Sequence, residues 1–387
     1  MIYFDNAATS WPKPATVPVA MVDFLRECGA NPGRSGHGPS IQAARVVFEA
    51  RVRVARLFGH DDPLSVVFTK NATEALNLAL QGTLRPGDHV VTSTMEHNSV
   101  LRPLSALEDQ GVAVTRVPTA PDGLLDPADV VRALTSRTRL VVLSQASNVV
   151  GALCPIQEIG AQLAGRDLLF CVDAAQSAGA CPLDVRAQGI DLLAFTGHKA
   201  LLGPQGTGGL VLGARARGRL RPLLQGGTGS RSDSDRHPDF LPDCFEAGTL
   251  NAVGLAGLVA GIAFVEERGV AAIRQHELAL TALLLAGLRE IPGVRVLGPG
   301  DPARRTAVVS FDLAGWHCSE VAQALEDRAG ICCRAGLHCA PLAHRQLGTF
   351  PEGTVRLSLG LFNTEAEITT ALAAVRELAL LPRGGLP

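Results

Sequence analysis

The feature that most constrains the fold is a regular alternation of short apolar runs and longer amphipathic runs through residues 41–212. Strands that alternate with helices form parallel sheets covered by helices on both faces. The pattern therefore predicts an α/β fold with a mainly parallel seven-stranded sheet flanked by helices. The predicted strands are Ser65–Thr69, His89–Ser93, Ala113–Val117, Leu140–Gln145, Leu168–Asp173, Leu192–Thr196 and Gly209–Leu212. The predicted helices between them include Ile41–Phe58, Thr73–Gln81, Val100–Gln110 and Pro155–Ala164.

The pattern changes after about Ala247. Two long helical stretches, Ala252–Glu267 and Val270–Ile291, lead into shorter elements, and the last helix opens with a capping box at Thr364. The shorter elements are predicted as the strands Ala307–Leu313 and Thr354–Gly360 and the helix Ser319–Ala329. We assign residues 15–250 to a large domain, and residues 1–14 with 251–387 to a smaller α+β domain.

Composition excludes several classes of protein. With 47% hydrophobic and 19% charged residues, the chain is typical of a globular enzyme. A net charge of −2 with 4% aromatic residues gives no support for nucleic-acid binding, and the apolar stretch Ala252–Val265 is too short to span a membrane. Nine cysteines without a Cys-x-x-Cys pair, and no secretory signal, predict a cytoplasmic protein without a disulfide framework or a metal site.

Two charged residues follow predicted strands and suggest a cofactor. Lys199 comes shortly after Leu192–Thr196, and Asp173 ends Leu168–Asp173. Ligands of such sheets bind at the carboxyl ends of the strands. A lysine there can carry a Schiff base, and an aspartate can face a pyridine nitrogen, which is what pyridoxal phosphate (PLP) requires. For either residue alone, a structural salt bridge is the alternative.

Other polar residues also follow predicted strands. A helix that opens at Ala72 and Thr73 would present free N–H groups to a phosphate, although Asn71 also fits an ordinary helix cap. His97 could stack on a cofactor ring or be an ordinary satisfied histidine, and Asn148 could bind a ring hydroxyl or be a turn residue. Their succession along the chain favours the cofactor interpretation over each alternative.

On these residues the chain resembles class V aminotransferase-fold enzymes, and specifically the cysteine desulfurase and selenocysteine lyase family. The matching stretches run from Phe4-Asp5-Asn6-Ala7-Ala8-Thr9 to Arg356-Leu357-Ser358, and include Thr196-Gly197-His198-Lys199 and Phe245-Glu246-Ala247-Gly248-Thr249. The resemblance implies a PLP fold-type I homodimer with its active site at the subunit interface. It implies that Thr249 reaches the phosphate of the neighbouring subunit's cofactor. The other implied cofactor-binding residues are Ala72, Thr73, His97, Asn148, Asp173, Gln176, Thr196, His198 and Lys199.

The segment Arg334-Ala335-Gly336-Leu337-His338-Cys339-Ala340-Pro341 resembles the family motif with the sulfur-accepting cysteine. A thiolate at Cys339 could take sulfur from the substrate, and Arg334 and His338 could favour that thiolate. The alternative for Cys339 is a small buried hydrophobe. Cys332 and Cys333 fit core positions better than a sulfur relay. The short loop resembles the second type of desulfurase, which relies on a partner sulfur acceptor.

The remaining implied residues bind substrate. Arg356 matches the arginine that holds the substrate carboxylate, for which a bidentate fork is suited. Arg334, Ala7 and His37 are further expected substrate-binding residues.

The predicted function is a PLP-dependent desulfurase that converts L-cysteine to L-alanine and leaves a persulfide on Cys339. The expected catalytic residues are Lys199, Cys339, His97 and Asp173, with Lys199 or His97 handling the Cα proton. The alternatives are a selenocysteine lyase, a transaminase or epimerase of the same superfamily, and a PLP-binding regulatory protein without turnover.

Overall fold

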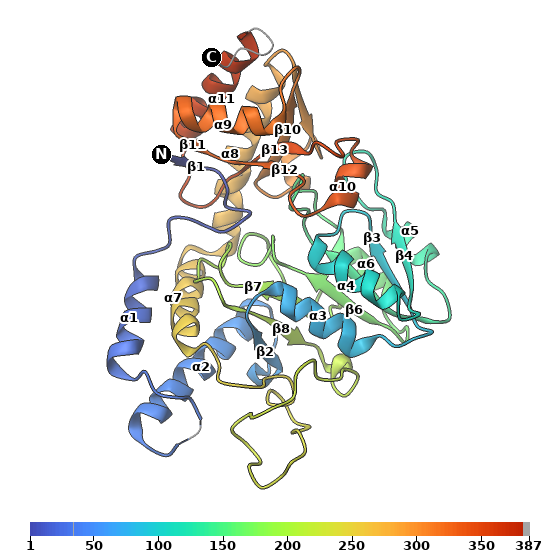
Figure 1. Ribbon diagram of the computed structural model, residues 1–387, viewed down its shortest axis with the longest axis vertical. Helices are drawn as coiled ribbons and strands as arrows, with labels where there is room; N and C mark the ends of the chain where they lie inside the picture. The colour runs from blue at the N-terminus through green and yellow to red at the C-terminus, as the bar shows by residue number, and fades with distance from the viewer. Residues whose placement is uncertain (34, 382–387) are drawn as a thin grey trace.

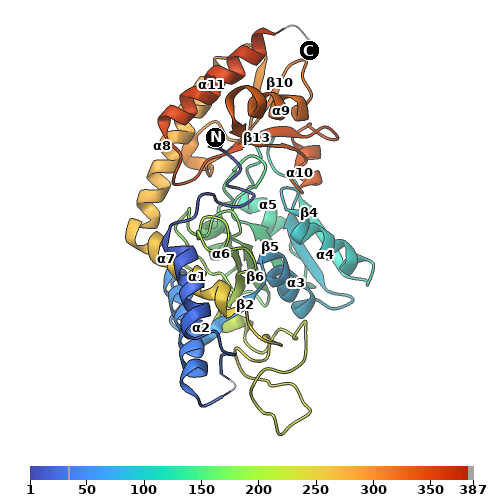
Figure 2. The same ribbon diagram turned by 60° about the vertical axis from the view of Figure 1, so that its left-hand side comes forward.

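The computed structural model describes residues 1–33 and 35–381, which form two layered units (Figures 1 and 2). The larger unit surrounds a seven-stranded sheet and the smaller unit contains a four-stranded sheet. The N-terminus and the last helix both lie in the smaller unit, so the chain leaves that unit, builds the larger one and returns (Figure 1).

The sheet of the larger unit confirms the predicted, mainly parallel arrangement. Its spatial order is β2-β8-β7-β6-β5-β3-β4, in which β8 runs antiparallel to both neighbours. The pairs β6–β7, β5–β6, β3–β5 and β3–β4 are parallel. The strands are β2 (Val66–Thr69), β3 (His89–Ser93), β4 (Ala113–Val117), β5 (Thr138–Ser144), β6 (Leu169–Asp173), β7 (Leu192–Thr196) and β8 (Gly208–Leu212).

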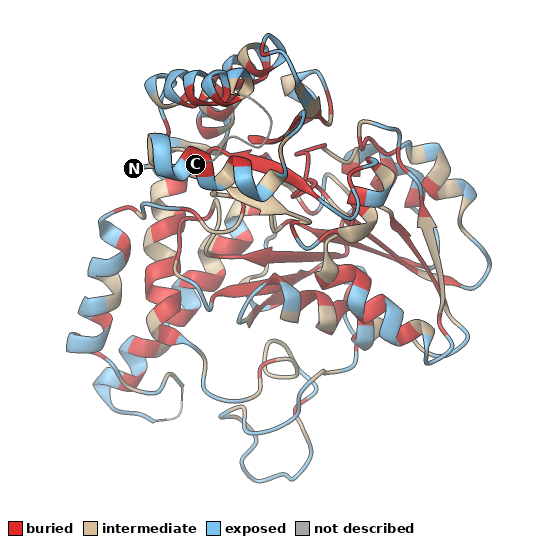
Figure 3. Cartoon of the chain, turned by 45° about the horizontal axis from the view of Figure 1, so that its top comes forward, coloured by how far each residue is buried: buried red, intermediate tan, exposed pale blue. Residues whose placement is uncertain are grey.

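Helices cover both faces of this sheet, so its central strands are buried throughout (Figure 3). Successive side chains of a strand point to opposite faces. In β6, Phe170 and Val172 belong to one core cluster, and Leu169 and Cys171 belong to another. The helices of this unit are α1 (Thr16–Glu27), α2 (Gly38–Leu57), α3 (Ala72–Thr83), α4 (Asn98–Glu108), α5 (Pro127–Arg132), α6 (Ile156–Leu163) and α7 (Ala252–Arg268).

The smaller unit is an antiparallel sheet of order β12-β13-β10-β9 with its own apolar core. A two-stranded parallel sheet joins β1 to β11 and so attaches the start of the chain to this unit. Thr364 forms the predicted capping box at the start of the last helix. The strands are β1 (Ile2–Tyr3), β9 (Val294–Leu297), β10 (Val308–Leu313), β11 (Ile331–Cys332), β12 (Arg334–Gly336) and β13 (Thr354–Ser358). The helices are α8 (Val270–Arg289), α9 (Cys318–Ala329), α10 (Pro341–Gln346) and α11 (Glu365–Leu380).

Helix α7 packs with the larger unit. Leu255, Leu258 and Ile262 share a core cluster with α2 and with strands of the seven-stranded sheet. We therefore propose that the smaller domain begins after α7 rather than at residue 251, whereas residues 382–387 of the predicted domain lie outside the described residues. Within the described part of the chain, no helix is both long enough and apolar enough to cross a membrane.

A buried ion pair joins α2 to the segment that precedes α7. The Glu246 carboxylate accepts a hydrogen bond of 2.8 Å from Arg51 Nη1 and one of 2.6 Å from the Phe68 backbone N–H. Arg51 also lies over the ring of Phe68. The side chains of both charged partners are almost completely buried.

We expect Glu246→Ala to lower the free energy of unfolding by about 3–5 kcal/mol, because it leaves a buried guanidinium without its counter-charge. Urea denaturation measures this loss. The matched control is Asp312→Ala, which removes the partner of the exposed Arg295 and should cost below about 1 kcal/mol. Equal losses of unfolding free energy in the two variants would contradict the prediction that the buried ion pair matters more to stability than the exposed one.

Candidate active site

A polar pocket lies at the carboxyl ends of β5, β6 and β7, between the two units. Its cavity volume is about 290 Å³. It brings together residues that are far apart in the sequence, as expected for the strand ends of a parallel sheet. Every predicted cofactor-binding residue except Thr249 lines it: Ala72, Thr73, His97, Asn148, Asp173, Gln176, Thr196, His198 and Lys199. The predicted substrate-binding residues Ala7, Arg334 and Arg356 line it as well.

Lys199 and Asp173 are the two opposite charges at the centre of this pocket. Burial lowers the pKa of Lys199 to about 8, although the Asp173 charge opposes that shift. Burial also raises the pKa of Asp173. Asp173 Oδ1 accepts a hydrogen bond from the Ala175 N–H at 2.9 Å. Among the described residues, none donates to Oδ2 and none accepts a hydrogen bond from Lys199 Nζ. Both groups therefore have bonding capacity left for a ligand.

The N-terminus of α3 lies at one end of the pocket, which Asn71, Ala72 and Thr73 line. The side chain of Asn71 caps the helix through the Glu74 N–H, so the first N–H groups, at Ala72 and Thr73, stay available. Thr73 Oγ1 lies 2.7 Å from Ser99 Oγ. Free N–H groups and the positive end of the helix dipole suit a phosphate.

His97 is held in one orientation by the helix that follows it. Its Nδ1 accepts a hydrogen bond from the Ser99 N–H at 3.0 Å, so the proton of the neutral ring is assigned to Nε2. Burial, reinforced by the charges of Lys199 and Arg334, lowers the pKa of His97 to about 4. The preceding residue, Glu96, is buried and accepts from the N–H and hydroxyl of Ser144, which fixes this loop against the end of β5.

Asn148 lines the pocket, as its predicted role requires, and its amide also contacts the smaller unit. Its Nδ2 donates a 2.6 Å hydrogen bond to the carbonyl of His338, so the amide is tied to the turn that carries Cys339. Its side-chain oxygen remains for a ligand. Gln176 Nε2 donates to the Ala7 carbonyl, and His198 Nδ1 is buried without a hydrogen bond.

Cys339 lies in a strained turn after β12. His338 and Cys339 have φ angles of 48° and 59°, in the left-handed region that residues other than glycine seldom adopt. Two bonds from the larger unit hold the turn, because the Asn98 N–H donates to the Cys339 carbonyl at 2.8 Å and Asn148 binds His338. The Cys339 thiol is exposed, and its Sγ is 3.5 Å from Arg334 Nη2.

The expected help of His338 to the thiolate is wrong. His338 is buried, its Nε2 lies 3.2 Å from Thr354 Oγ1, and burial with the nearby Arg356 charge lowers its pKa to about 2. A neutral ring brings no positive charge to the thiol. Arg334 is therefore the cation that contacts Cys339.

Arg356 is fully buried in β13 and faces the pocket. Its Nη2 donates to Asp5 Oδ1 at 2.6 Å and its Nη1 donates to the Asn148 carbonyl at 3.1 Å. Its Nε is buried without a hydrogen bond. An orphaned guanidinium donor at a pocket is suited to a ligand carboxylate.

Two predicted residues lie away from this pocket. His37 is exposed and caps α2 by accepting from the Ser40 N–H, so within one chain the expected contact of His37 with substrate is not formed. Thr249 is also exposed and lines a separate cavity with Asn31 and Gly33. Cys333 packs against the core of the smaller unit, in agreement with the core interpretation.

Sequence reasoning missed Ser99, Ser144 and Asp5. Ser99 follows His97 by two residues, a spacing that could have indicated the capping contact. Ser144 ends β5 as Asp173 ends β6, so strand register places it at the same edge. Asp5 is within the quoted opening motif, but nothing local indicates its pairing with Arg356.

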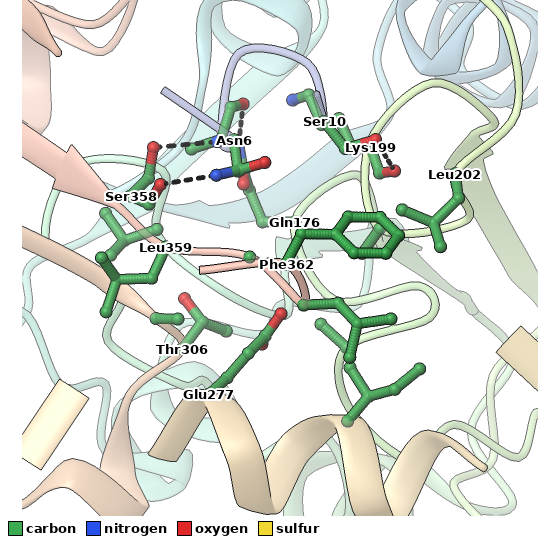
Figure 4. Close-up of a pocket in the computed structure, with 18 residues that line it drawn as sticks. Asn6, Ser10, Gln176, Lys199, Leu202, Glu277, Thr306, Ser358, Leu359 and Phe362 are labelled. Carbon is green, nitrogen blue, oxygen red and sulfur yellow. Dashed lines mark hydrogen bonds between the residues drawn. The ribbon is translucent and has the colours of Figure 1, made fainter. Parts of the chain in front are cut away.

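A second, narrower cavity lies behind Lys199 and Gln176 (Figure 4). Glu277 of α8 reaches into it from the side opposite Ser10 and Lys199. Burial raises the pKa of Glu277 to about 8, so the side chain is mostly protonated at neutral pH.

Comparisons with known proteins agree over the length of the chain. The family model of the class-V aminotransferases matches residues 2–370. A probable cysteine desulfurase of Methanothermobacter thermautotrophicus is 38% identical over 383 residues, covering 98% of this chain and 94% of that protein. One from Pyrococcus abyssi is 35% identical over 386 residues, covering 98% and 94%.

Solved structures show the same likeness. The apo structure of a cysteine desulfurase from Thermococcus onnurineus NA1 has a TM-score of 0.92 at 35% identity, covering 98% of this chain and 94% of that one. A cysteine desulfurase from Escherichia coli has a TM-score of 0.87 at 30% identity, covering 98% and 95%. The layers and the strand order described above are therefore those of a known fold.

Two buried histidines predict a pH-dependent stability: His338 of the pocket and His344 of α10, whose ring centroids lie 5.5 Å apart. An unfolded histidine takes up a proton near pH 6.5, whereas the pKa values of His338 and His344 fall to about 2 and about 4 in the folded chain. The contribution of these histidines to the unfolding free energy should thus be fully present above pH 6.5 and fall as the pH drops to 5, by up to about 1.4 kcal/mol per pH unit for each histidine. Denaturant titrations at several pH values measure this slope.

His338→Gln should flatten the slope, because it removes one of the groups that charge only on unfolding. The control is His317→Gln, at an exposed position, for which the slope should stay as in the unsubstituted chain. A slope unaffected by His338→Gln would contradict the neutral, buried state of this ring.

Proposed function

Because the chain belongs to the class-V aminotransferase family, and within it to the cysteine desulfurases, we propose that it is a PLP-dependent enzyme that converts L-cysteine to L-alanine and transfers the sulfur to Cys339. The observation that carries this proposal is the convergence of Lys199, Asp173 and Arg356 on one pocket with Cys339 in the turn beside it.

The polar groups of the pocket that lack a hydrogen-bond partner match the polar groups of PLP. The free oxygen of the buried Asp173 is matched by a protonated pyridine nitrogen, and the open N-terminus of α3 is matched by a phosphate. Ala72 and Thr73 would hold the phosphate, and His97 would lie against the ring. When bound, PLP supplies an aldehyde that reacts with amines and a ring that accepts the electrons of a carbanion.

Lys199 is the residue suited to hold the cofactor and then to move the Cα proton. A pKa of about 8 gives a substantial fraction of neutral amine near neutral pH, as a nucleophile and a base require. His97 was the alternative base. Its Nδ1 lone pair is already used by the Ser99 N–H, so it is better suited to donate from Nε2 than to accept a proton.

Cys339 is the residue suited to take the sulfur. Its thiolate would attack the substrate sulfur and form an S–S bond, while the C–S bond breaks and its electron pair stays with the substrate carbon. That carbon then takes a proton and leaves as alanine, so the electrons balance without an external oxidant. The guanidinium of Arg334 lies 3.5 Å from this sulfur, on the side of the attacking atom.

A second copy of the chain and a sulfur acceptor complete the proposal. Thr249 is exposed and away from its own pocket, which supports a role for it in the pocket of a neighbouring subunit. The exposed position of Cys339 supports delivery of sulfur to an acceptor protein. All nine cysteines are free, which supports the reducing environment of a cytoplasm.

Lys199 should be the amine that holds PLP. After incubation with PLP and reduction with borohydride, mass spectrometry should find one covalently fixed cofactor per chain, and Lys199→Ala should abolish it. Lys70→Met is the control, because Lys70 is exposed and outside the pocket, and its label should persist. An undiminished label in Lys199→Ala would assign the cofactor to another amine.

Cys339→Ser should reduce alanine and sulfide release from L-cysteine by at least about a hundredfold, since a hydroxyl is a far weaker sulfur acceptor. The persulfide proposed on residue 339 should also be absent from this variant. Cys318→Ser is the matched control in the same unit, where the thiol donates to the Glu352 carbonyl at 3.2 Å and does not line the pocket, and it should retain activity. L-selenocysteine assayed beside L-cysteine distinguishes the selenocysteine lyase alternative. Wild-type rates in Cys339→Ser would reject the proposed sulfur transfer.

A further inference from the structure

The N-terminal segment Asp5–Lys13 connects the two groups that would bind the ends of an amino acid. At its start, Asp5 accepts the 2.6 Å hydrogen bond from Arg356 Nη2 and forms a bridge with Ser358, two residues further along β13. Asn6 Nδ2 adds a 3.1 Å hydrogen bond to the Ser358 carbonyl. These contacts fix the start of the segment to the strand that carries Arg356.

The same segment contacts the backbone at Lys199 a few residues later. Ser10 Oγ donates to the Lys199 carbonyl at 2.8 Å, and Lys13 Nζ donates to the His198 carbonyl at 2.7 Å. Figure 4 shows both junctions, with Asn6 beside Ser358 and Ser10 beside Lys199. One short stretch of chain thereby sets the spacing between β13 and the strand end that carries Lys199.

Arg356 needs such a restraint because another cation lies opposite it. Arg334 of β12 is its direct cross-strand partner in the antiparallel pair. Like charges directly opposite each other repel, and a buried guanidinium without a counter-charge is costly. The Asp5 carboxylate forms the ion pair of Arg356, while Asn148 offers only a carbonyl.

We propose that Asp5 is a positioning residue, which holds the guanidinium of Arg356 so that its remaining donors face the carboxylate of the amino-acid substrate. The inference rests on the proposed function for the identity of that substrate. Asp5 takes one N–H of Nη2 and the Asn148 carbonyl takes one N–H of Nη1, so the buried Nε–H and one N–H on each Nη stay available. Arg356 is thus oriented before the substrate arrives.

The effect of removing Asp5 separates positioning from competition. If Asp5 merely competed with the substrate carboxylate for Arg356, its removal would tighten substrate binding. If it positions Arg356, its removal weakens binding, because the guanidinium turns away from Arg334 and must be reoriented at each binding event. A misplaced binding group lowers affinity by between about ten- and a hundredfold.

The test uses the full chain loaded with PLP and compares Asp5→Ala, Asp5→Asn and the control Asp312→Ala, which breaks the exposed ion pair of the same sheet. We expect Asp5→Ala to raise the KM for L-cysteine by about ten- to a hundredfold with much less change in kcat. Absorbance titrations of Asp5→Ala should show the same loss of affinity for L-alanine. They should show no loss of affinity for L-alaninamide, which lacks the carboxylate. The KM of Asp5→Asn should lie between those of the unsubstituted chain and Asp5→Ala, since the amide oxygen still accepts a hydrogen bond from Arg356 Nη2.

Unchanged or tighter binding of L-alanine by Asp5→Ala, or equal losses for L-alanine and L-alaninamide, would overturn the positioning role. Should Asp5→Ala fail to fold, the same comparison of the two ligands in Asp5→Asn decides. If the wild-type chain binds L-alanine but produces no L-alanine from L-cysteine, the proposed function is wrong. The titrations would still decide the role of Asp5 in that case.

Discussion

The juxtaposition of Lys199 and Asp173 is the interaction on which the rest of the site depends. The two groups belong to the ends of neighbouring parallel strands, since Asp173 is in register with Ala194 of β7. Without covering helices, a carboxylate and an amine at the edge of a sheet would stay in water, because burying a charged group is costly. Burial needs strands covered on both faces, and the clusters around α2 with α7 and around α3 with α4 provide that cover.

The position of these residues at strand ends explains how much of the fold and the site could be predicted from the sequence. β3, β4 and β7 match their predicted bounds because each is a short run rich in apolar or β-branched residues, and strand identity depends on local sequence. Lys199, Asp173 and the α3 N-terminus then follow from the rule that parallel strands end at one edge. Helix α1 was missed, and its Val-Pro-Val opening lacks a side-chain cap. β1 and β11 have two residues each, so only their pairing across the whole chain identifies them.

Contacts between the two units were the least predictable part of the site. Asn148 binds the His338 carbonyl and Asn98 binds the Cys339 carbonyl, and neither bond leaves a trace in local sequence. Both contacts act on a turn whose left-handed backbone costs about 1–3 kcal/mol at each residue other than glycine. The larger unit therefore holds the Cys339 turn in a conformation that it would not keep alone. Loosening the contacts between the two units would free the turn, as the proposed transfer of sulfur from a substrate to an acceptor would need.

The charges around the pocket act on His97 and on the proposed ligands. The charges of Lys199, Arg334 and Arg356 all add to the effect of burial in lowering the pKa of His97, so the ring stays neutral beside the proposed binding place of a substrate carboxylate. The same field suits the anionic groups of the proposed ligands, namely the cofactor phosphate and the substrate carboxylate. Asp173 and Asp5 are the acidic groups set against these cations, one at the cofactor end and one at Arg356. Each acid therefore restrains one cation, and the remaining positive charge is left for the ligand.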